Sequence, residues 1–159
     1  MAERFSQKNL RVRPSSDEDK IVTNAKEHFE KTLVEISGEL VGSVAALEHP
    51  TKNKKLNYGE IFLRDNVPVM IYLITQKRYE IVKRFLSVCL ELQSTNYQTR
   101  GVFPTSFVEE NGKLIGDYGQ RSIGRITSAD ASLWWPILCW YYVNKSGDYA
   151  FGKSQGVQR

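Results

Sequence analysis

The sequence predicts an all-α domain that is interrupted by one long loop region. Apolar residues recur at three- and four-residue steps over residues 21–47, 81–92 and 131–144, which is the spacing of a buried helix face. Residues 95–129 instead carry repeated glycines between short apolar pieces. With 41% apolar and 25% charged residues, the chain of 159 residues has the composition of an ordinary globular domain.

The first expected element is a long helix that follows a polar arm. Residues 1–16 are polar and basic, so we expect a flexible arm there and a folded domain over residues 17–159. Three acidic residues directly after the arm favour a helix N-terminus. The apolar pattern predicts one helix from there to residue 47, in which Gly38 and Gly42 mark close packing or a bend.

Two shorter helices are expected next, joined by a short link. Proline is preorganised for the first turn of a helix, so Val67-Pro68 predicts a helix that starts there and ends near Gln76. The following helix has its apolar residues between Ile81 and Leu92. Because the link is short, the two helices should be antiparallel neighbours.

A small β-hairpin is expected around residues 101–116, within the loop region. Asn111-Gly112 is a turn signal between two short apolar pieces, residues 105–108 and 113–115. A loop region of this length in a compact domain is usually functional. We therefore look for the site near this region.

The last predicted helix runs from Ala131 to Asn144. Its expected N-cap is Asp130 or Ser132, because side chains of both kinds can accept a hydrogen bond from the first turn. Gly147 lies just beyond the expected end, where glycine commonly closes a helix.

Charge and composition argue against several classes of function. The net charge of +4 comes from small clusters, not a basic stripe, so we expect no nucleic acid partner. No apolar run approaches the ~20 residues of a membrane span, so we expect no membrane partner. The sequence has no Cys/His cluster with zinc-ligand spacing and no phosphate-cradling glycine pattern, so we expect no metal and no cofactor. Cys89 and Cys139 lie in apolar helical stretches, which favours reduced thiols and a cytoplasmic protein.

Asp130 is the first candidate for chemistry. It stands at a loop-to-helix junction, directly before a stretch that contains two tryptophans. As an N-cap it would only stabilise the helix start. As a general acid it would be desolvated by aromatic neighbours, which raises the pKa of a carboxyl group as protonation of a leaving group at neutral pH requires. Spacing alone leaves both interpretations open.

Arg64-Asp65 and the aromatic residues of the last helix are further candidates. Arg64 and Asp65 form either a local ion pair with a helix cap, or a pair of groups that hydrogen-bond sugar hydroxyls. Aromatic residues in such a helix most often pack in a core, although one of them can form a platform for a sugar ring. These aromatic residues are Trp134, Trp135, Trp140, Tyr141 and Tyr142.

Taken together and in this order, several stretches resemble the alkaline/neutral invertase family, glycoside hydrolase family 100. The resemblance covers about residues 56–150. The stretches that carry it are LNYGEIFLRDNVP at 56–68, EIVKRFL at 80–86, GVFPTSF at 101–107, DYGQRSIGR at 117–125, DASLWW at 130–135 and SGD at 146–148.

The resemblance implies an (α/α)6 barrel, of which this chain forms the first part, and hydrolysis of sucrose to glucose and fructose with inversion. It implies no metal or cofactor, a cytosolic or organellar location, and allows a homo-oligomer of the full-length protein. Asp130 matches the general acid of the family, and Arg64 and Asp65 match its Arg-Asp loop motif. Further positions expected in the same sugar pocket are Tyr58, Gln120, Arg125 and Trp134.

The second catalytic carboxylate of the family, a Glu, is expected beyond residue 159. An inverting hydrolase needs this group as the base that activates water. We therefore expect a fragment that is inactive alone and a full-length parent that is active. Two alternatives remain open, namely a non-catalytic helical interaction module derived from an invertase, and an (α/α)6 hydrolase of another disaccharide.

Overall fold

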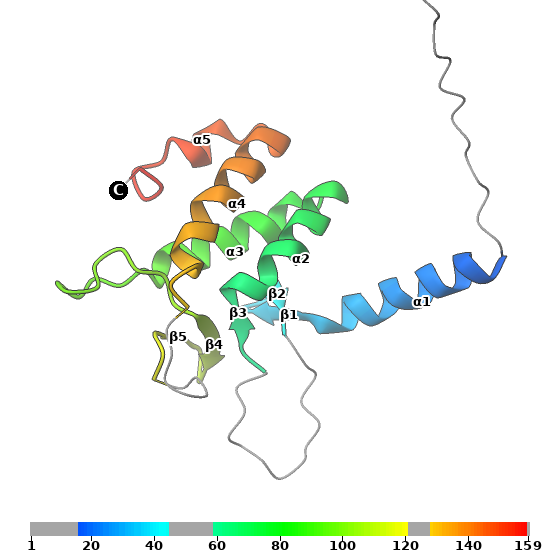
Figure 1. The fold of residues 1–159 in the computed structure, drawn as a ribbon, viewed down its shortest axis with the longest axis horizontal. Coiled ribbons are helices and arrows are strands. Elements are labelled where there is room, and N and C mark those ends of the chain that lie inside the picture. The colour runs from blue at the N-terminus through cyan, green and yellow to red at the C-terminus, as the bar shows by residue number, and fades with distance from the viewer. Residues whose placement is uncertain (1–15, 45–58, 121–127, 159) are drawn as a thin grey trace, which may run out of the picture. The chain divides into compact units, whose positions relative to one another are not determined.

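The structure is a computed structural model that describes residues 16–44, 59–120 and 128–158 (Figure 1). The contacts between Cα atoms divide the chain into two compact units, Met1–Lys31 and Thr32–Arg159. Helix α1 (Ser16–Thr32) belongs to the first unit except for its last residue, and all other elements belong to the second. The predicted flexible arm lies outside the described residues, apart from Ser16.

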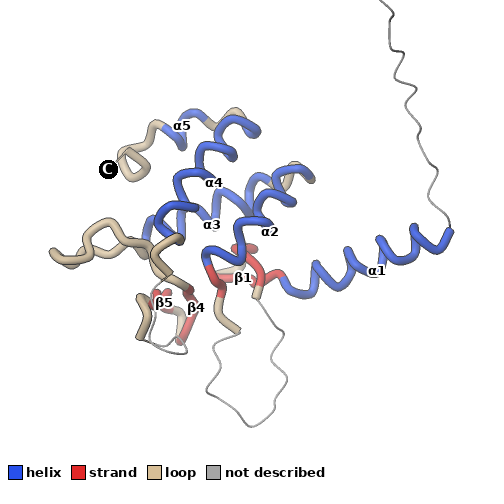
Figure 2. Tube along the Cα trace, in the orientation of Figure 1, coloured by secondary structure: helices blue, strands red, loops and turns tan. Residues whose placement is uncertain are grey.

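About half of the described residues are helical, and the strands form two small antiparallel sheets (Figure 2). After α1 the elements are β1 (Leu33–Ile36), β2 (Glu39–Ser43), β3 (Ile61–Phe62), α2 (Leu63–Thr75), α3 (Tyr79–Glu91), β4 (Ser106–Glu110), β5 (Lys113–Asp117), α4 (Ala131–Ser146) and α5 (Tyr149–Gly152). One sheet is β1-β2 and the other is β3-β4-β5. The structure is thus consistent with part of a helical domain, and the β1-β2 sheet is an addition to the single small hairpin that the sequence predicts.

A β-hairpin replaces the second half of the predicted long helix. Helix α1 ends at Thr32, and β1 and β2 then pair with Ile36 opposite Glu39. The two turn residues, Ser37 and Gly38, have φ angles of 53° and 82°. Positive φ at both central residues is the geometry of tight hairpin turns, so the turn favours strands over a continued helix. Gly38 therefore marks the bend that the sequence indicated.

Gly42 lies where β2 packs on the start of α2. A Cβ atom at this position would lie 2.9 Å from Cγ2 of Ile61 and 3.0 Å from Oδ1 of Asn66. The buried Asn66 side chain accepts a hydrogen bond from the N–H of Ser43 at 2.7 Å and donates to the Ser43 carbonyl at 2.9 Å. The same amide donates to the Phe62 carbonyl at 2.8 Å. Close packing at Gly42 is confirmed, and it joins the hairpin to α2.

Helix α2 begins at Leu63 instead of the predicted Val67. Leu63, Val67 and Ile74 are all buried, so the apolar stripe of the helix already includes the residues before Pro68. The N–H of Leu63, one of the donors that a first turn leaves unpaired, donates to the carbonyl of Thr105 at 3.0 Å. Helix α3 agrees with the prediction and packs against α2.

The hairpin expected around residues 101–116 is formed by β4 and β5. Glu110 pairs with Lys113, and the turn residues Asn111 and Gly112 have φ angles of 53° and 73°. This is the two-residue hairpin turn that an Asn-Gly pair favours. Strand β3 pairs with the other edge of β4, and this pairing places the start of α2 beside the hairpin.

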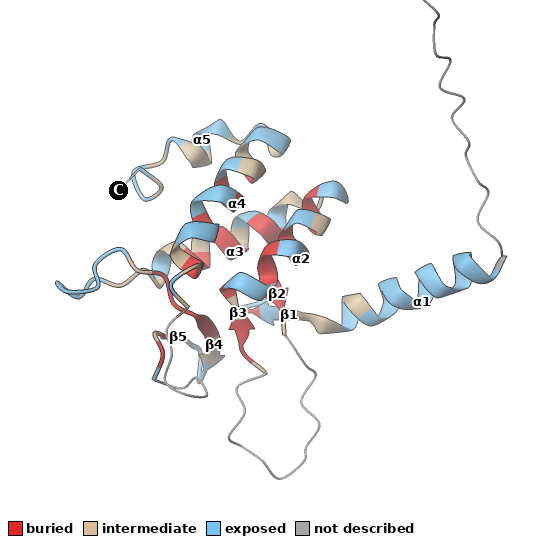
Figure 3. Cartoon of the chain, in the orientation of Figure 1, coloured by how far each residue is buried: buried red, intermediate tan, exposed pale blue. Residues whose placement is uncertain are grey.

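Helix α4 begins at Ala131 as predicted and continues to Ser146. Gly147 follows it with a φ of 76°, the left-handed conformation in which glycine closes a helix. The core of the second unit lies where α2, α3 and α4 pack against one another and where α2 and α3 pack against β2, as the red segments in Figure 3 show. Cys89 and Cys139 are both buried there as free thiols. None of the described helices has the length and apolarity to cross a membrane.

Candidate active site

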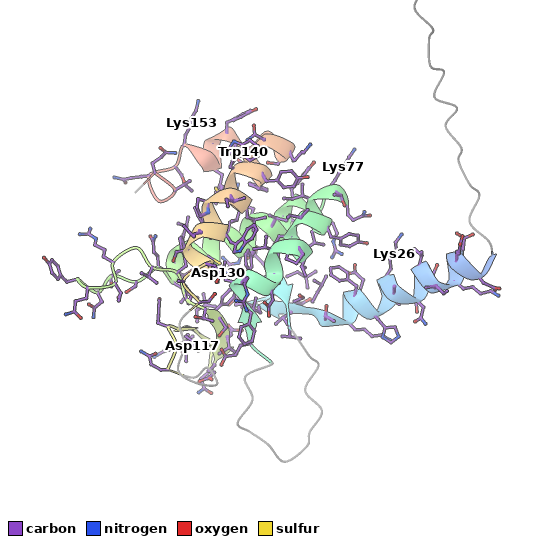
Figure 4. The ribbon with its side chains drawn as sticks, in the orientation of Figure 1. Lys26, Lys77, Asp117, Asp130, Trp140 and Lys153 are labelled. Atoms are coloured by element: carbon purple, nitrogen blue, oxygen red, sulfur yellow. The ribbon has the colours of Figure 1, made fainter. Side chains whose placement is uncertain are left out.

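A cavity of about 400 Å³ lies beside the first turns of α2 and α4, two helices that pack against each other. It combines two charged side chains with four apolar ones. The lining residues are Arg64, Val67, Pro68, Ile71, Asp130 and Trp134. This volume falls within the range of about 300–1,000 Å³ that is usual for small-molecule sites. Figure 4 labels Asp130 at the start of α4.

The carboxylate of Asp130 faces this cavity instead of capping α4. The backbone of Asp130 begins the helix, since its carbonyl accepts from the N–H of Trp134 at 2.9 Å, but its side chain makes no capping hydrogen bond. Oδ1 accepts a hydrogen bond from the hydroxyl of Ser128, and Oδ2 lies 3.7 Å from Nη1 of Arg64. The interpretation of Asp130 as a side-chain N-cap is therefore wrong. Ser132 does not cap either, because its hydroxyl accepts from the N–H of Phe103 at 3.2 Å.

The neighbours of Asp130 favour its ionised form. The hydrogen bond from Ser128 lowers the pKa of the carboxyl group most, partial loss of water raises it, and the positive charge of Arg64 lowers it further. The net result is a pKa below the ordinary value. The expectation that aromatic neighbours raise this pKa is wrong for the chain in this state, because the Asp130 side chain is 41% exposed and stays in contact with water.

Arg64 lies between two carboxylates. Its Nε is 3.5 Å from Oδ1 of Asp65, and its Nη1 is 3.7 Å from Oδ2 of Asp130. Both distances exceed the roughly 2.7–2.9 Å of a short charge-assisted hydrogen bond. The three side chains are each about half exposed, and ion pairs of this kind are weak in water. The guanidinium donors can therefore turn to a polar ligand in the cavity at little cost.

The two adjacent tryptophans of α4 have different surroundings. Trp135 is 4% exposed, stacks on Phe103 with ring centroids 5.0 Å apart, and donates its indole N–H to the carbonyl of Leu86 at 3.2 Å. Trp134 is 38% exposed and lines the cavity. Trp135 is thus a core residue, and Trp134 is the one whose ring can meet a ligand.

The remaining predicted site residues are not brought to the cavity by the described parts of the chain. Gln120 is exposed and does not line the cavity; its N–H donates to Oδ1 of Asp117 at 2.8 Å, as the N–H of Gly119 does at 3.0 Å. Tyr58 and Arg125 lie outside the described residues. The structure therefore brings together Arg64, Asp130 and Trp134, with Asp65 beside Arg64.

Sequence reasoning missed Ser128 and the apolar floor of the cavity. Ser128 precedes Asp130 by two positions, and serine is common in loops before helices, so its spacing carries no distinctive signal. Val67 and Ile71 belong to α2, and a helix pattern alone does not show which of its edges another helix leaves open. Within residues 16–44, 59–120 and 128–158, no group of three or more His, Cys, Asp or Glu side chains could hold a metal ion.

Comparison with known proteins identifies similar chains. Residues 25–159 match the family of alkaline and neutral invertases. The chain is 32% identical over 162 residues to the alkaline/neutral invertase CINV2 of Arabidopsis thaliana. This match covers 94% of this chain and 29% of the relative. It is 34% identical over 166 residues to the mitochondrial neutral/alkaline invertase 1 of Oryza sativa subsp. japonica, with 94% and 26% covered. The chloroplastic neutral/alkaline invertase 3 of the same plant is 32% identical over 165 residues, with 93% and 26% covered.

The chain therefore spans less than a third of the length of these relatives. The relatives also correct the expected cytoplasmic location, because they include proteins named as mitochondrial and chloroplastic. Reduced thiols are the basis of that expectation, and they do not separate the cytoplasm from other compartments in which thiols stay reduced. The two buried thiols therefore do not show a cytoplasmic location, and the expectation of one is wrong. The location of this protein is not determined.

Proposed function

Because the chain belongs to the alkaline and neutral invertase family, we propose that it supplies the acid side of a sucrose-hydrolysing site, with Asp130 as the general acid. The proposed reaction of the full-length parent splits sucrose with water into glucose and fructose, with inversion at the attacked carbon. The proposed fold of the parent is an (α/α)6 barrel, to which α2, α3 and α4 contribute the first helices.

The observation that carries this proposal is the carboxylate of Asp130 in the cavity. An aspartate at a helix start would ordinarily accept hydrogen bonds from the first turn. In this chain the side chain is turned from that role toward Arg64 and Ser128. A carboxyl group placed beside donors and a half-exposed indole is suited to meet a sugar.

The other cavity residues fit the recognition of a disaccharide. Arg64 offers several N–H donors to sugar hydroxyls, and the adjacent Asp65 offers acceptors. Trp134 and Ile71 present apolar surface to the C–H face of a sugar ring. We assign Arg64 and Asp65 to hydroxyl binding, and Trp134 to ring stacking. Tyr58, Gln120 and Arg125 remain proposed pocket residues on the family resemblance alone.

The chemistry requires Asp130 to carry a proton when the glycosidic bond breaks. The acid gives this proton to the glycosidic oxygen, and a base on the opposite side of the ring takes one from the attacking water, so that both products leave neutral. The pKa of Asp130 is lowered while the carboxyl group is open to water. A docked sugar and a covering part of the parent would exclude water and raise this pKa.

The base must come from another carboxylate. Asp130 is the only carboxylate among the six residues that line the cavity. Inverting enzymes place their two carboxyl groups roughly 6.5–9.5 Å apart, which leaves room for the water molecule. We propose that the longer parent provides this group from beyond residue 159 and that the 159-residue chain alone is inactive on sucrose.

The experiment that tests the proposal is Asp130→Asn in the full-length parent. Asparagine keeps the size of the side chain but cannot donate a proton as an acid, so sucrose turnover should fall by roughly 10²–10⁴-fold. Unchanged circular dichroism and melting temperature would show that the variant is folded. Sucrose turnover at the wild-type rate would refute the assignment of Asp130.

A panel of disaccharides on the wild-type parent addresses the two alternatives. Turnover of another disaccharide in preference to sucrose would identify a different hydrolase of the same architecture. A folded parent that hydrolyses none of them would favour the non-catalytic interaction module.

A further inference from the structure

Asp130 is linked by consecutive hydrogen bonds to Thr105, a residue of the segment before β4. We propose that Thr105 is a positioning residue for Asp130, because its hydroxyl anchors Ser128 and the hydroxyl of Ser128 holds the carboxylate. The catalytic meaning of this arrangement rests on the proposed function, whereas the arrangement itself can be tested without any activity.

The backbone of Thr105 is fixed on two sides. Its carbonyl accepts a hydrogen bond from the N–H of Leu63 at 3.0 Å, and Leu63 directly precedes Arg64. Its N–H donates to the carbonyl of Asp117 at 2.7 Å, at the end of β5. Thr105 is 8% exposed, so water does not compete freely for these groups. Its position relative to the first turn of α2 is therefore well defined.

The side chain of Thr105 bonds to the segment that precedes α4, on the Asp130 side of the cavity. Its Oγ1 accepts a hydrogen bond from the N–H of Ser128 at 3.0 Å. The hydroxyl of Ser128 donates to Oδ1 of Asp130, and its carbonyl accepts from the N–H of Ala131 at 3.3 Å. Ser128 is thus held at its N–H by Thr105 and at its carbonyl by the first turn of α4.

A further hydrogen bond joins the segment before β4 to the first turn of α4. The N–H of Phe103 donates to the hydroxyl of Ser132 at 3.2 Å. Residues 103–105 therefore contact the chain on both sides of Asp130 and also hold the residue before Arg64. These bonds hold the backbone next to Arg64 at a defined position relative to the chain on both sides of Asp130.

Direct attraction between the two charged groups cannot set this spacing. The groups that face Asp130 are Arg64 and, beyond it, Asp65, all on the half-exposed rim of the cavity. An exposed pair at 3.7 Å is too weak to hold two flexible side chains in one geometry. A hydrogen bond to a part-buried N–H is more restrictive, because its loss leaves the donor without a partner. The hydroxyl of Thr105 is such an acceptor.

The test compares Thr105→Val with Thr105→Ser in the 159-residue chain. Valine keeps the branched shape and removes the acceptor, whereas serine keeps the acceptor and removes the methyl group. The readouts by NMR are the amide hydrogen exchange of Ser128 and the pH titration of the Asp130 carboxyl carbon. In the valine variant we expect exchange at Ser128 to be roughly five- to tenfold faster and the pKa of Asp130 to rise toward its ordinary value. The serine variant should match the wild type in both.

Ser128→Ala tests the hydrogen bond from the Ser128 hydroxyl to Asp130, and we do not expect this substitution to unfold the chain. The pKa of Asp130 should rise in this variant, because the hydrogen bond from the Ser128 hydroxyl is lost. An unchanged Asp130 pKa in Ser128→Ala would overturn the proposal even if Thr105→Val failed to fold. A Ser128 amide that exchanges without protection in the wild type, or an unchanged titration in a folded Thr105→Val, would overturn it equally.

Activity of the full-length parent separates this proposal from the assignment of Asp130. Thr105→Val should lower kcat for sucrose more than it changes KM, and Thr105→Ser should restore kcat. If the NMR results are as expected but Asp130→Asn turns over sucrose normally, positioning stands and the proposed acid role fails. If Asp130→Asn is inactive while Thr105→Val affects neither readout nor kcat, the acid role stands and positioning fails.

Discussion

The two faces of α4 differ sharply in exposure although their residues alternate along one helix. The inner face carries Trp135, Leu138 and Tyr142, which are 4%, 1% and 2% exposed. The outer face carries Trp134 and Ile137, which are 38% and 53% exposed. Neighbouring residues in a helix point about 100° apart, so one step along the chain exchanges core for surface.

This comparison teaches that residue type does not separate packing from binding in this helix. Both faces are apolar and aromatic, and the helix has no polar side to mark its exposed surface. The surroundings separate them. Trp135 packs on Phe103 and donates to the carbonyl of Leu86 in α3. Trp134 lies instead beside Arg64 and Asp130 in the cavity.

The largest expected effect is the loss of the inner tryptophan. Trp135→Ala should lower the free energy of unfolding by about 3–5 kcal/mol, because it removes a stacked ring and leaves a cavity in the core. The matched variant Trp134→Ala should cost about 1 kcal/mol or less, since its ring is partly in water. Urea unfolding followed by circular dichroism measures both. Similar losses in the two variants would contradict the division into faces.

A second adjacent pair tests the same division with aliphatic side chains. Leu138→Ala should lower the free energy of unfolding by about 2–4 kcal/mol, because the side chain is almost fully buried. Ile137→Ala on the outer face should cost about 1 kcal/mol or less. The same urea titration decides the order, and a larger loss for Ile137→Ala would show that this face is covered in solution.

The smallest expected effect concerns the pH dependence of stability at the cavity. The folded chain holds the pKa of Asp130 below its ordinary value, so ionised Asp130 contributes stability above about pH 4. This contribution is lost as the pH falls through the lowered pKa. The difference in melting temperature between the wild type and Asp130→Asn should therefore shrink between pH 7 and pH 2. A difference that grows on acidification would contradict this account.

Much of the second unit could be predicted from the sequence, because its local signals are strong. The Asn111-Gly112 turn, the apolar face of α3 and the glycine after α4 each depend on residues within a few positions of one another. The long helix predicted up to residue 47 failed over residues 33–43, because Ser37 and Gly38 adopt the positive φ angles of a hairpin turn.

The candidate site could be predicted only in part. Arg64, Asp130 and Trp134 were found through motifs, and the structure places them around one cavity. The pKa direction of Asp130 could not be predicted, because it depends on the hydroxyl of Ser128 and the guanidinium of Arg64, which lies 66 positions earlier in the chain. The proposed role of Thr105 could not be predicted for the same reason, because it depends on contacts with distant segments of the chain.

The most direct test of the acid role compares two substrates in Asp130→Asn of the full-length parent. Sucrose needs a proton on its leaving oxygen, whereas α-glucosyl fluoride releases fluoride with little help from an acid. We predict that kcat for sucrose falls by roughly 10²–10⁴-fold, while hydrolysis of the fluoride falls far less. Equal losses on both substrates, or no loss on sucrose, would contradict Asp130 as the general acid.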